Sequence, residues 1–153
     1  MANDRLQRLE DIDAIRALIA RYGPLADAGI SKELAALWTE DGTYEVGNFG
    51  TAKGREEIAA LIDSETHRGL MAQGCAHILP SPSITLNGDR ATATGYSIVL
   101  RKVGDAWEAW RVSANRWELE RQSDGEWLAA KRINQLLDGS EAARALLGAG
   151  VTP

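Results

Sequence analysis

Cysteine and histidine are scarce in this chain of 153 residues, which contains one cysteine, Cys75, and two histidines, His67 and His77. A single cysteine cannot form an intramolecular disulfide, and so few ligands cannot supply a zinc site with the usual spacing. The glycines follow neither the GxxxxGK[ST] pattern nor the strand-linked GxGxxG pattern that binds nucleotide phosphates. We therefore expect neither a metal nor a cofactor, and any chemistry must come from ordinary side chains.

The chain also lacks a long hydrophobic run and an excess of basic residues. No window reaches the roughly 18 consecutive apolar residues that a membrane span requires. The polar, acidic start of the sequence does not have the pattern of a secretory signal. The formal net charge is −5, and the lysines and arginines are scattered along the chain. These absences predict a cytoplasmic protein that binds neither membranes nor nucleic acid.

The residues that are present indicate one globular domain with helices in its first half. Hydrophobic residues make up 44% of the chain and charged residues 25%, which is typical of a soluble domain of this length. Apolar residues recur every three or four positions from residue 6 to 28, which predicts a long amphipathic helix that Gly29 ends. Ser31 is expected to cap a short second helix over residues 32–38, and residues 54–69 are expected to form a third helix.

From residue 75 onward the sequence is almost entirely strand-like. Long runs of alternating polar and apolar residues are separated by turn signals that contain Gly and Asp. Helices followed by a long antiparallel meander predict an α+β domain, in which the helices cover one face of a strongly curved, mostly antiparallel sheet. We assign this single domain to residues 1–138, and residues 139–153 to a tail that is either a small helix or a loose arm. The cavity between helices and sheet is the expected place for a functional site.

His77 is the first candidate for chemistry. In the strand that begins at Cys75, alternation places Cys75, His77 and Leu79 on one face, so the imidazole has small or apolar neighbours. Burial and a nearby carboxylate can move the pKa of such a histidine in either direction, which suits a proton shuttle. A core histidine paired with a backbone carbonyl would give the same pattern, and the residues alone leave both interpretations open. His67, beside Arg68 at the end of the predicted third helix, is interpreted as a surface cap.

Two charged residues occupy unusual positions. Asp27 lies in the last turn of the first helix, where the helix dipole disfavours a carboxylate by about 0.3–1 kcal/mol. An ordinary turn aspartate is the alternative. Arg132 shares one face of the last strand with Leu128, Ala130 and Asn134, which suggests a guanidinium at the end of an interior face. The alternative is an exposed position or a salt bridge at the sheet edge.

The tryptophans are concentrated in the predicted late strands. Trp107, Trp110, Trp117 and Trp127 lie there, and Trp38 ends the predicted second helix. Such residues are more often core or subunit-interface residues than substrate platforms. Their concentration predicts a large apolar sheet surface that self-association covers, so we expect a homo-oligomer.

Five segments, taken in order, resemble the successive blocks of SnoaL-like proteins of the nuclear transport factor 2-like superfamily. They are IRALIARYGPLADAG, LAALWTEDGTYEV, GTAKGREEIAALI, GCAHILPSPSI and DGEWLAAKRIN. The resemblance covers residues 10–136 and is closest to the branch of γ-hexachlorocyclohexane dehydrochlorinase and scytalone dehydratase. It implies a deep, cone-shaped pocket in which an aspartate at the end of the first helix holds a histidine on the strand after the third. The matching positions are Asp27 and His77, and the arginine of the dehydrochlorinase KRN segment falls on Arg132.

The resemblance also implies which residues line the pocket. Tyr22 and Tyr44 stand where the dehydrochlorinase has a lysine and a tryptophan, and scytalone dehydratase resembles this chain in having tyrosines near both places. The second histidine that scytalone dehydratase carries on a later strand is missing, because no histidine follows His77. The remaining expected substrate-binding residues are Ser97, Val99 and Ser113.

The implied chemistry is proton abstraction from carbon by a histidine base. Asp27 would fix the tautomer of His77, and Arg132 would stabilise an oxyanion or a leaving group. We expect a cofactor-independent lyase, a dehydratase or dehydrohalogenase, that acts on a small, largely apolar ring compound. One alternative is an isomerase or polyketide cyclase with the same base. Another is a non-catalytic binding or assembly subunit like the β subunit of ring-hydroxylating dioxygenases. The resemblance favours a homotrimer, with a dimer as the alternative.

Overall fold

The computed structural model describes residues 2–151. The elements follow in the order α1 (Ala2–Asp27), α2 (Ser31–Ala35), β1 (Trp38–Val46), the 3-10 helix η1 (Gly47–Phe49), β2 (Thr51–Lys53), α3 (Gly54–Ile62), α4 (Glu65–Gln73), β3 (Cys75–Ile78), β4 (Ser83–Asn87), β5 (Arg90–Val103), β6 (Ala106–Arg121), β7 (Trp127–Leu136) and α5 (Glu141–Ala149). One sheet has the order β2-β1-β7-β6-β5-β3, and β4 also pairs with β5. All pairs are antiparallel except the parallel pair of β1 and β7. The predicted α+β class is confirmed.

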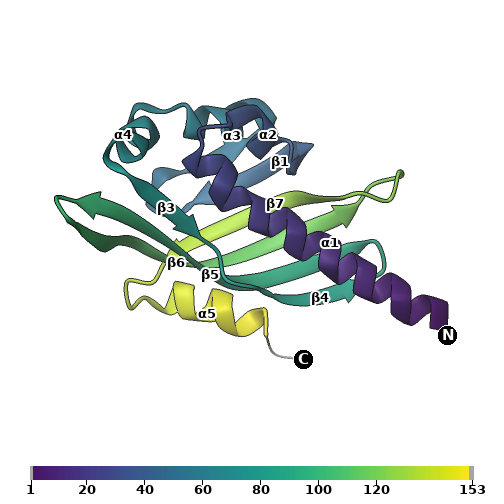
Figure 1. Cartoon of the computed structure of the whole chain (residues 1–153). Helices are drawn as coiled ribbons and strands as arrows, with labels where there is room; N and C mark the ends of the chain where they lie inside the picture. The colour runs from purple at the N-terminus through teal and green to yellow at the C-terminus, as the bar shows by residue number, and fades with distance from the viewer. Residues whose placement is uncertain (1, 152–153) are drawn as a thin grey trace.

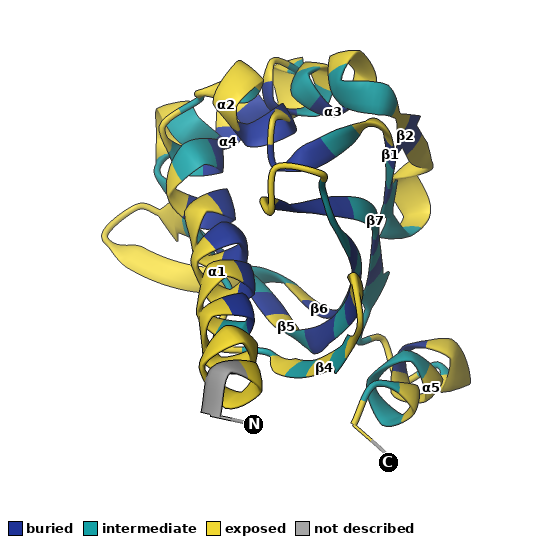
Figure 2. Cartoon of the chain, turned by 90° about the vertical axis from the view of Figure 1, so that its right-hand side faces the viewer, coloured by how far each residue is buried: buried dark blue, intermediate teal, exposed yellow. Residues whose placement is uncertain are grey.

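The sheet separates two groups of helices. Helices α1 to α4 lie on its concave side, and α5 packs against β6 and β7 on the other side (Figure 1). Figure 2 shows that the buried side of α1 faces the curved sheet, with α2, α3 and α4 above the space between them. Among the described residues, no helix combines the length and the apolar character of a membrane span. The interior therefore lies between the four N-terminal helices and the concave face of the sheet.

The long first helix is confirmed, but its buried stripe starts later than the sequence pattern suggests. Buried apolar side chains recur every three or four positions from Ile15 to Ala26, as expected for an amphipathic helix. Leu6 and Leu9 are 54% and 64% exposed, because the first turns of α1 run beyond the end of the sheet (Figure 1).

Two of the predicted helix boundaries are wrong. The predicted third helix is two helices, because Ser64 interrupts the run by accepting a hydrogen bond from the backbone N–H of His67 at 3.2 Å. The predicted second helix ends three residues early, and Trp38 is the first residue of β1 instead. Ser31 does not cap α2, since the N-cap residue is Ile30 and no side chain caps the helix.

A β-bulge corrects the predicted alternation along β7. Glu118 pairs with Lys131 and Leu119 with Ala129, so Ala130 is an extra residue in β7. The insertion shifts the faces by one position, as bulges do. Ala129 is therefore fully buried, whereas Ala130 does not share the interior face of Arg132.

Aromatic side chains form the part of the core nearest to the interior space. Trp38, Trp117 and Tyr44 surround Tyr22, with ring centroids 6.1 to 6.2 Å from the Tyr22 ring in edge-on arrangements. Such pairs stabilise by about 0.5–1.5 kcal/mol beyond area burial. The interpretation of the tryptophans as core residues holds for Trp38, Trp117 and Trp127.

The remaining tryptophans and the outer face of the sheet are more exposed to solvent than the aromatic core. Trp107 is 53% exposed, and Trp110 is half-buried. Ile78, Ile98 and Val112 are neighbours across β3, β5 and β6, and Ile78 and Val112 are exposed. The expected homo-oligomer stays a prediction.

Asp11 joins α1 to the sheet through a buried ion pair. Arg121 donates from both Nη atoms to the two carboxylate oxygens at 2.6 and 2.7 Å, and Trp127 Nε1 donates to Oδ1 at 3.1 Å. Arg121 also pairs with Asp89. The hydrogen bond from Arg121 lowers the pKa of Asp11 to about 2, against the opposing effect of burial.

We expect Asp11→Ala to lower the free energy of unfolding by about 1–3 kcal/mol, because it leaves the buried Trp127 N–H without its acceptor, while Arg121 keeps only its exposed partner Asp89. Urea denaturation at neutral pH measures the effect, and Asp13→Ala, on an exposed position of the same helix, is the control. The pKa of Asp11 lies below its ordinary value of 3.8. Its stabilisation is therefore complete above about pH 4 and is lost as the pH falls toward about 2, so the variant should be less sensitive to acid over that range. Equal stability of the two variants would show that the ion pair contributes nothing.

Candidate active site

A cavity of about 290 Å³ opens between the helices and the concave face of the sheet. Its size lies at the lower end of the range for small-molecule sites. Asp27 lies beside the cavity, next to His77. The other seven residues predicted for the site line the cavity, namely Tyr22, Tyr44, His77, Ser97, Val99, Ser113 and Arg132.

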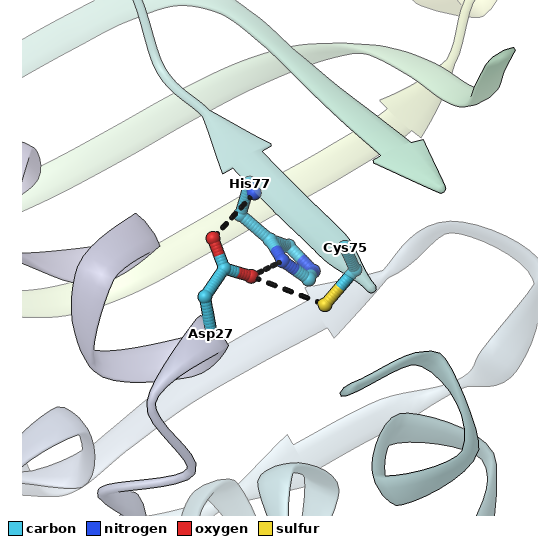
Figure 3. Close-up of side chains that lie close together, drawn as sticks. All are labelled: Asp27, Cys75 and His77. Carbon is cyan, nitrogen blue, oxygen red and sulfur yellow. Dashed lines mark hydrogen bonds and ion pairs between the residues drawn. The ribbon is translucent and has the colours of Figure 1, made fainter. Parts of the chain in front are cut away.

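Asp27 and His77 form a hydrogen-bonded pair at the end of α1. The Asp27 carboxylate accepts from Nδ1 of the His77 ring at 2.6 Å and from the backbone N–H of His77 at 2.8 Å (Figure 3). The thiol of Cys75 adds a weaker contact at 3.4 Å. The carboxylate therefore fixes both the ring and the backbone of His77.

The charge of Asp27 fixes the tautomer of its partner. Burial alone would raise the pKa of Asp27, but the hydrogen bonds from the ring and the backbone of His77 outweigh it and lower that pKa. An ionised carboxylate only accepts hydrogen bonds, so Nδ1 of His77 must carry the proton. In the neutral ring Nε2 is then free of a proton, on a side chain that lines the cavity. This is the arrangement of an oriented general base.

Gly23 allows α1 to approach β3 closely enough for this pair to form. A Cβ atom at position 23 would overlap with the backbone carbonyl oxygen of His77. Further along the chain, Gly29 has a φ of 69°, which ends the helix just beyond Asp27. Both glycines thus serve to place the carboxylate beside the histidine.

Replacing Gly23 with alanine should lower the free energy of unfolding by about 1–3 kcal/mol, because the added methyl group pushes α1 away from β3. Gly69→Ala is the matched control. It lies inside α4 with no atom within 4 Å of the added Cβ, so helix propensity should raise stability by up to about 1 kcal/mol. Thermal melts of the two variants should shift in opposite directions, and a shift of the same sign in both would contradict the close packing at Gly23.

Arg132 is buried at 1% exposure on the wall of the cavity. Its guanidinium lies over the rings of Tyr22, Trp117 and Tyr44, at 4.1, 4.4 and 4.5 Å from their centroids. Its Nε donates to Asn115 Oδ1 at 2.9 Å. An interior position is what the sequence predicted, and an exposed position or an edge salt bridge is excluded.

Tyr22 and Tyr44 bring two phenol groups to the same wall. Both are buried, and their rings meet edge-on with centroids 6.2 Å apart. Burial strongly raises the pKa of Tyr44, against a smaller opposing effect of Arg132. The Tyr44 hydroxyl therefore stays protonated and can act as a hydrogen-bond donor.

His67 is a site residue that the sequence interpretation missed. It is buried in the first turn of α4 and lines the cavity, where a surface cap at a helix end was predicted. Its Nε2 lies 2.7 Å from the carbonyl oxygen of Ala26, and its ring centroid is 5.4 Å from that of His77. Burial lowers the pKa of His67, against the opposing hydrogen bond to Ala26. The ring is therefore a neutral neighbour of His77 at neutral pH.

Arg111 was also not predicted from the sequence as a residue of the site. Arg111 of β6 lines the cavity and donates to Asn134 Oδ1 at 3.2 Å. Asn134 and Asn115 are buried, and both contact Ser97. Alternation along β6 and β7 was the available signal, since Arg111 and Ser113 on one strand and Arg132 and Asn134 on the other share faces.

Asp27, Cys75 and His77 each bring a potential metal ligand within 4.8 Å of the others. A thiol must lose its proton to bind a metal, but burial and then the Asp27 carboxylate raise the pKa of Cys75 to about 12. The oxygen atoms of Asp27 already accept three hydrogen bonds. The cluster therefore fits a hydrogen-bonded pair with a supporting thiol better than a metal centre.

Comparisons with known proteins agree on the family and the fold. The family model of the SnoaL-like domain matches residues 7–133. An NTF2-like protein with a cystatin-like fold from Novosphingobium aromaticivorans is 57% identical, with a TM-score of 0.93 over 95% of this chain and 94% of that chain. A variant of a Mycobacterium tuberculosis protein of unknown function is 22% identical, with a TM-score of 0.76 over 92% and 86% of the two chains. ActVI-ORFA from Streptomyces coelicolor is 24% identical, with a TM-score of 0.73 over 84% and 98%. No curated protein matches the chain.

Proposed function

Because the chain belongs to the SnoaL-like family of the NTF2-like superfamily, we propose that it is a cofactor-independent lyase with His77 as general base. The family includes polyketide cyclases and isomerases, and the proposal narrows its chemistry to a dehydratase or dehydrohalogenase. The observation that carries the proposal is the 2.6 Å bond between Asp27 and His77, on a histidine that lines an open cavity. The resemblance to the scytalone dehydratase and dehydrochlorinase branch supports the same assignment.

In the proposed reaction Nε2 of His77 removes a proton from a carbon atom of the substrate. The electron pair of the broken C–H bond forms a new C=C bond, and the leaving group departs from the neighbouring carbon with its own bonding pair. A halide leaves as the anion, whereas a hydroxide takes up a proton and leaves as water. Asp27 stabilises the imidazolium that forms after the first transfer, and the imidazolium then loses its extra proton to the solvent or to the leaving hydroxide.

The other polar groups of the wall would act on the charge that develops in the substrate. Arg132 and the hydroxyls of Tyr22 and Tyr44 can stabilise an oxyanion or the departing group, because their side chains are held in place on a buried wall. Apolar side chains form another part of the wall, among them Leu61, Leu70, Leu79 and Val99. A small, largely apolar ring compound is the substrate class that this lining suits.

An isomerase or cyclase would use the same base, and no residue of the cavity favours it over elimination. The open cavity does count against a non-catalytic assembly subunit, because such a subunit has no need of an unfilled interior or of a hydrogen-bonded Asp27 and His77. The geometry supports proton abstraction by His77, and the resemblance to the dehydratase and dehydrochlorinase branch is the reason for proposing elimination.

The experiment is a screen of the purified protein against halogenated, hydroxylated and polyketide-like ring compounds, with His77→Ala as the control. Elimination leaves a new conjugated double bond, seen by ultraviolet absorbance, and releases halide or water. Isomerisation gives a product of unchanged mass. Elimination that is present in the native protein and absent in the variant supports the proposal. Isomerisation without elimination, or turnover that is equal in both proteins, contradicts it.

A further inference from the structure

Arg111 and Arg132 line the cavity without an acidic partner. Arg132 Nη1 has no hydrogen-bond partner among the described residues, although the side chain is almost completely buried. Within the described part of the chain, neither arginine forms an ion pair, and neither aspartate nor glutamate lines the cavity. The cavity wall therefore carries two arginines and no carboxylate, and Asp27, which lies beside the cavity, is already hydrogen-bonded to His77.

The contacts of Arg132 within the protein only partly compensate for its burial. The three rings around its guanidinium contribute cation–π attraction, but they carry no net charge. Buried charges in proteins are as a rule paired or bound to a ligand, because the desolvation of an unpaired ion is costly. The missing partner is best supplied by something that enters the cavity.

The polar residues beside the arginines are oriented so that their acceptor atoms are already occupied. Asn115 Oδ1 accepts from Arg132, and Asn134 Oδ1 accepts from Arg111, so both amide oxygens are occupied. Both amide nitrogens donate to Ser97 Oγ, at 2.7 and 3.2 Å, and the Asn134 nitrogen also donates to Asn115 Oδ1 at 3.2 Å. Because Ser97 Oγ already accepts twice, its own hydrogen is available to an acceptor. This corner of the cavity therefore offers the N–H groups of the arginines and the O–H group of Ser97, and an anionic acceptor satisfies them.

We propose that the ligand is a carboxylic acid, namely an apolar ring that carries one carboxylate bound by Arg132 and Arg111. The proposal rests on the proposed function, because it names the substrate class of the same cavity. Planar guanidinium groups suit a carboxylate, which accepts two hydrogen bonds at once. Tyr22 contacts both Arg132 and His77, so a ring held by its carboxylate lies on the apolar wall beside the base.

The test compares 2-naphthoate with the neutral isostere 2-naphthamide in isothermal titration calorimetry at neutral pH. The native protein should bind the naphthoate at least about ten-fold more tightly. Arg132→Gln should abolish the preference. Arg111→Gln should reduce it several-fold, and this half-buried position keeps the test valid if the buried Arg132 variant fails to fold. Arg90→Gln, on an exposed arginine of β5, should leave the preference unchanged.

Equal affinity for the two compounds in the native protein would overturn the proposal, as would a preference that survives in Arg111→Gln at full strength. His77→Ala separates this result from the proposed function. That variant should keep the naphthoate preference, since the base takes no part in binding the carboxylate. If the protein prefers naphthoate but turns over no acidic ring compound, the carboxylate site is supported and the lyase function is contradicted.

Discussion

Replacing His77 with alanine is expected to lower kcat/KM by a factor of about 10²–10⁴ on any substrate that the screen identifies, because the variant lacks the base that takes the proton from carbon. The Asp27 carboxylate can still accept the backbone N–H of residue 77, so we expect the fold to persist. Thermal melts and circular dichroism check the fold, and steady-state kinetics measures the loss.

Added imidazole should restore part of the rate of this variant, because the free base can occupy the space that the side chain leaves. Rescue by imidazole distinguishes a missing base from a distorted cavity. A variant that turns over substrate as fast as the native protein would remove His77 from the mechanism.

Asp27→Asn should reduce kcat by about 10²–10⁴ with little change in KM. The asparagine oxygen can keep the bond to the His77 backbone, but its NH₂ group then faces Nδ1 as a donor. The ring responds by placing its proton on Nε2, so no lone pair points at the substrate. The variant also lacks the charge that stabilises the imidazolium.

The matched control for this variant is Asp13→Asn, which removes an exposed carboxylate from the same helix. It should leave both kinetic constants unchanged. An effect of Asp27→Asn on KM alone would mean that Asp27 shapes the binding site and does not orient the base.

The fold class followed from periodicity, but the element boundaries depended on contacts that no local pattern shows. The break between α3 and α4 lies at Ser64, in a stretch whose composition suits a helix. The feature that starts α4 is the Ser64 cap, three residues before His67. With the helix started there, His67 reaches the carbonyl oxygen of Ala26. Only this tertiary contact distinguishes a buried histidine from a surface cap.

The candidate site was predictable in part. For Arg132, the interior position was predicted correctly but from a wrong assignment of strand faces. Fifty positions separate Asp27 from His77, and no spacing rule connects them. The unfavourable charge at the end of the helix was the only local signal, and the family resemblance supplied the partner. Arg132 is interior as expected, yet the face assigned to it was misread because the bulge at Ala130 cannot be seen in an alternating sequence.

The position of His77 at the rim of the sheet has a consequence for aggregation. β3 is the last strand in the sheet order and pairs only with β5, so its other side would be open to a foreign strand. The outward N–H of His77 is taken by Asp27, and the carbonyl of His77 lies against α1 at Gly23. The same carboxylate that holds the His77 ring thus blocks the pairing of a foreign strand at His77. Assembly of several copies would then have to use a surface other than this edge.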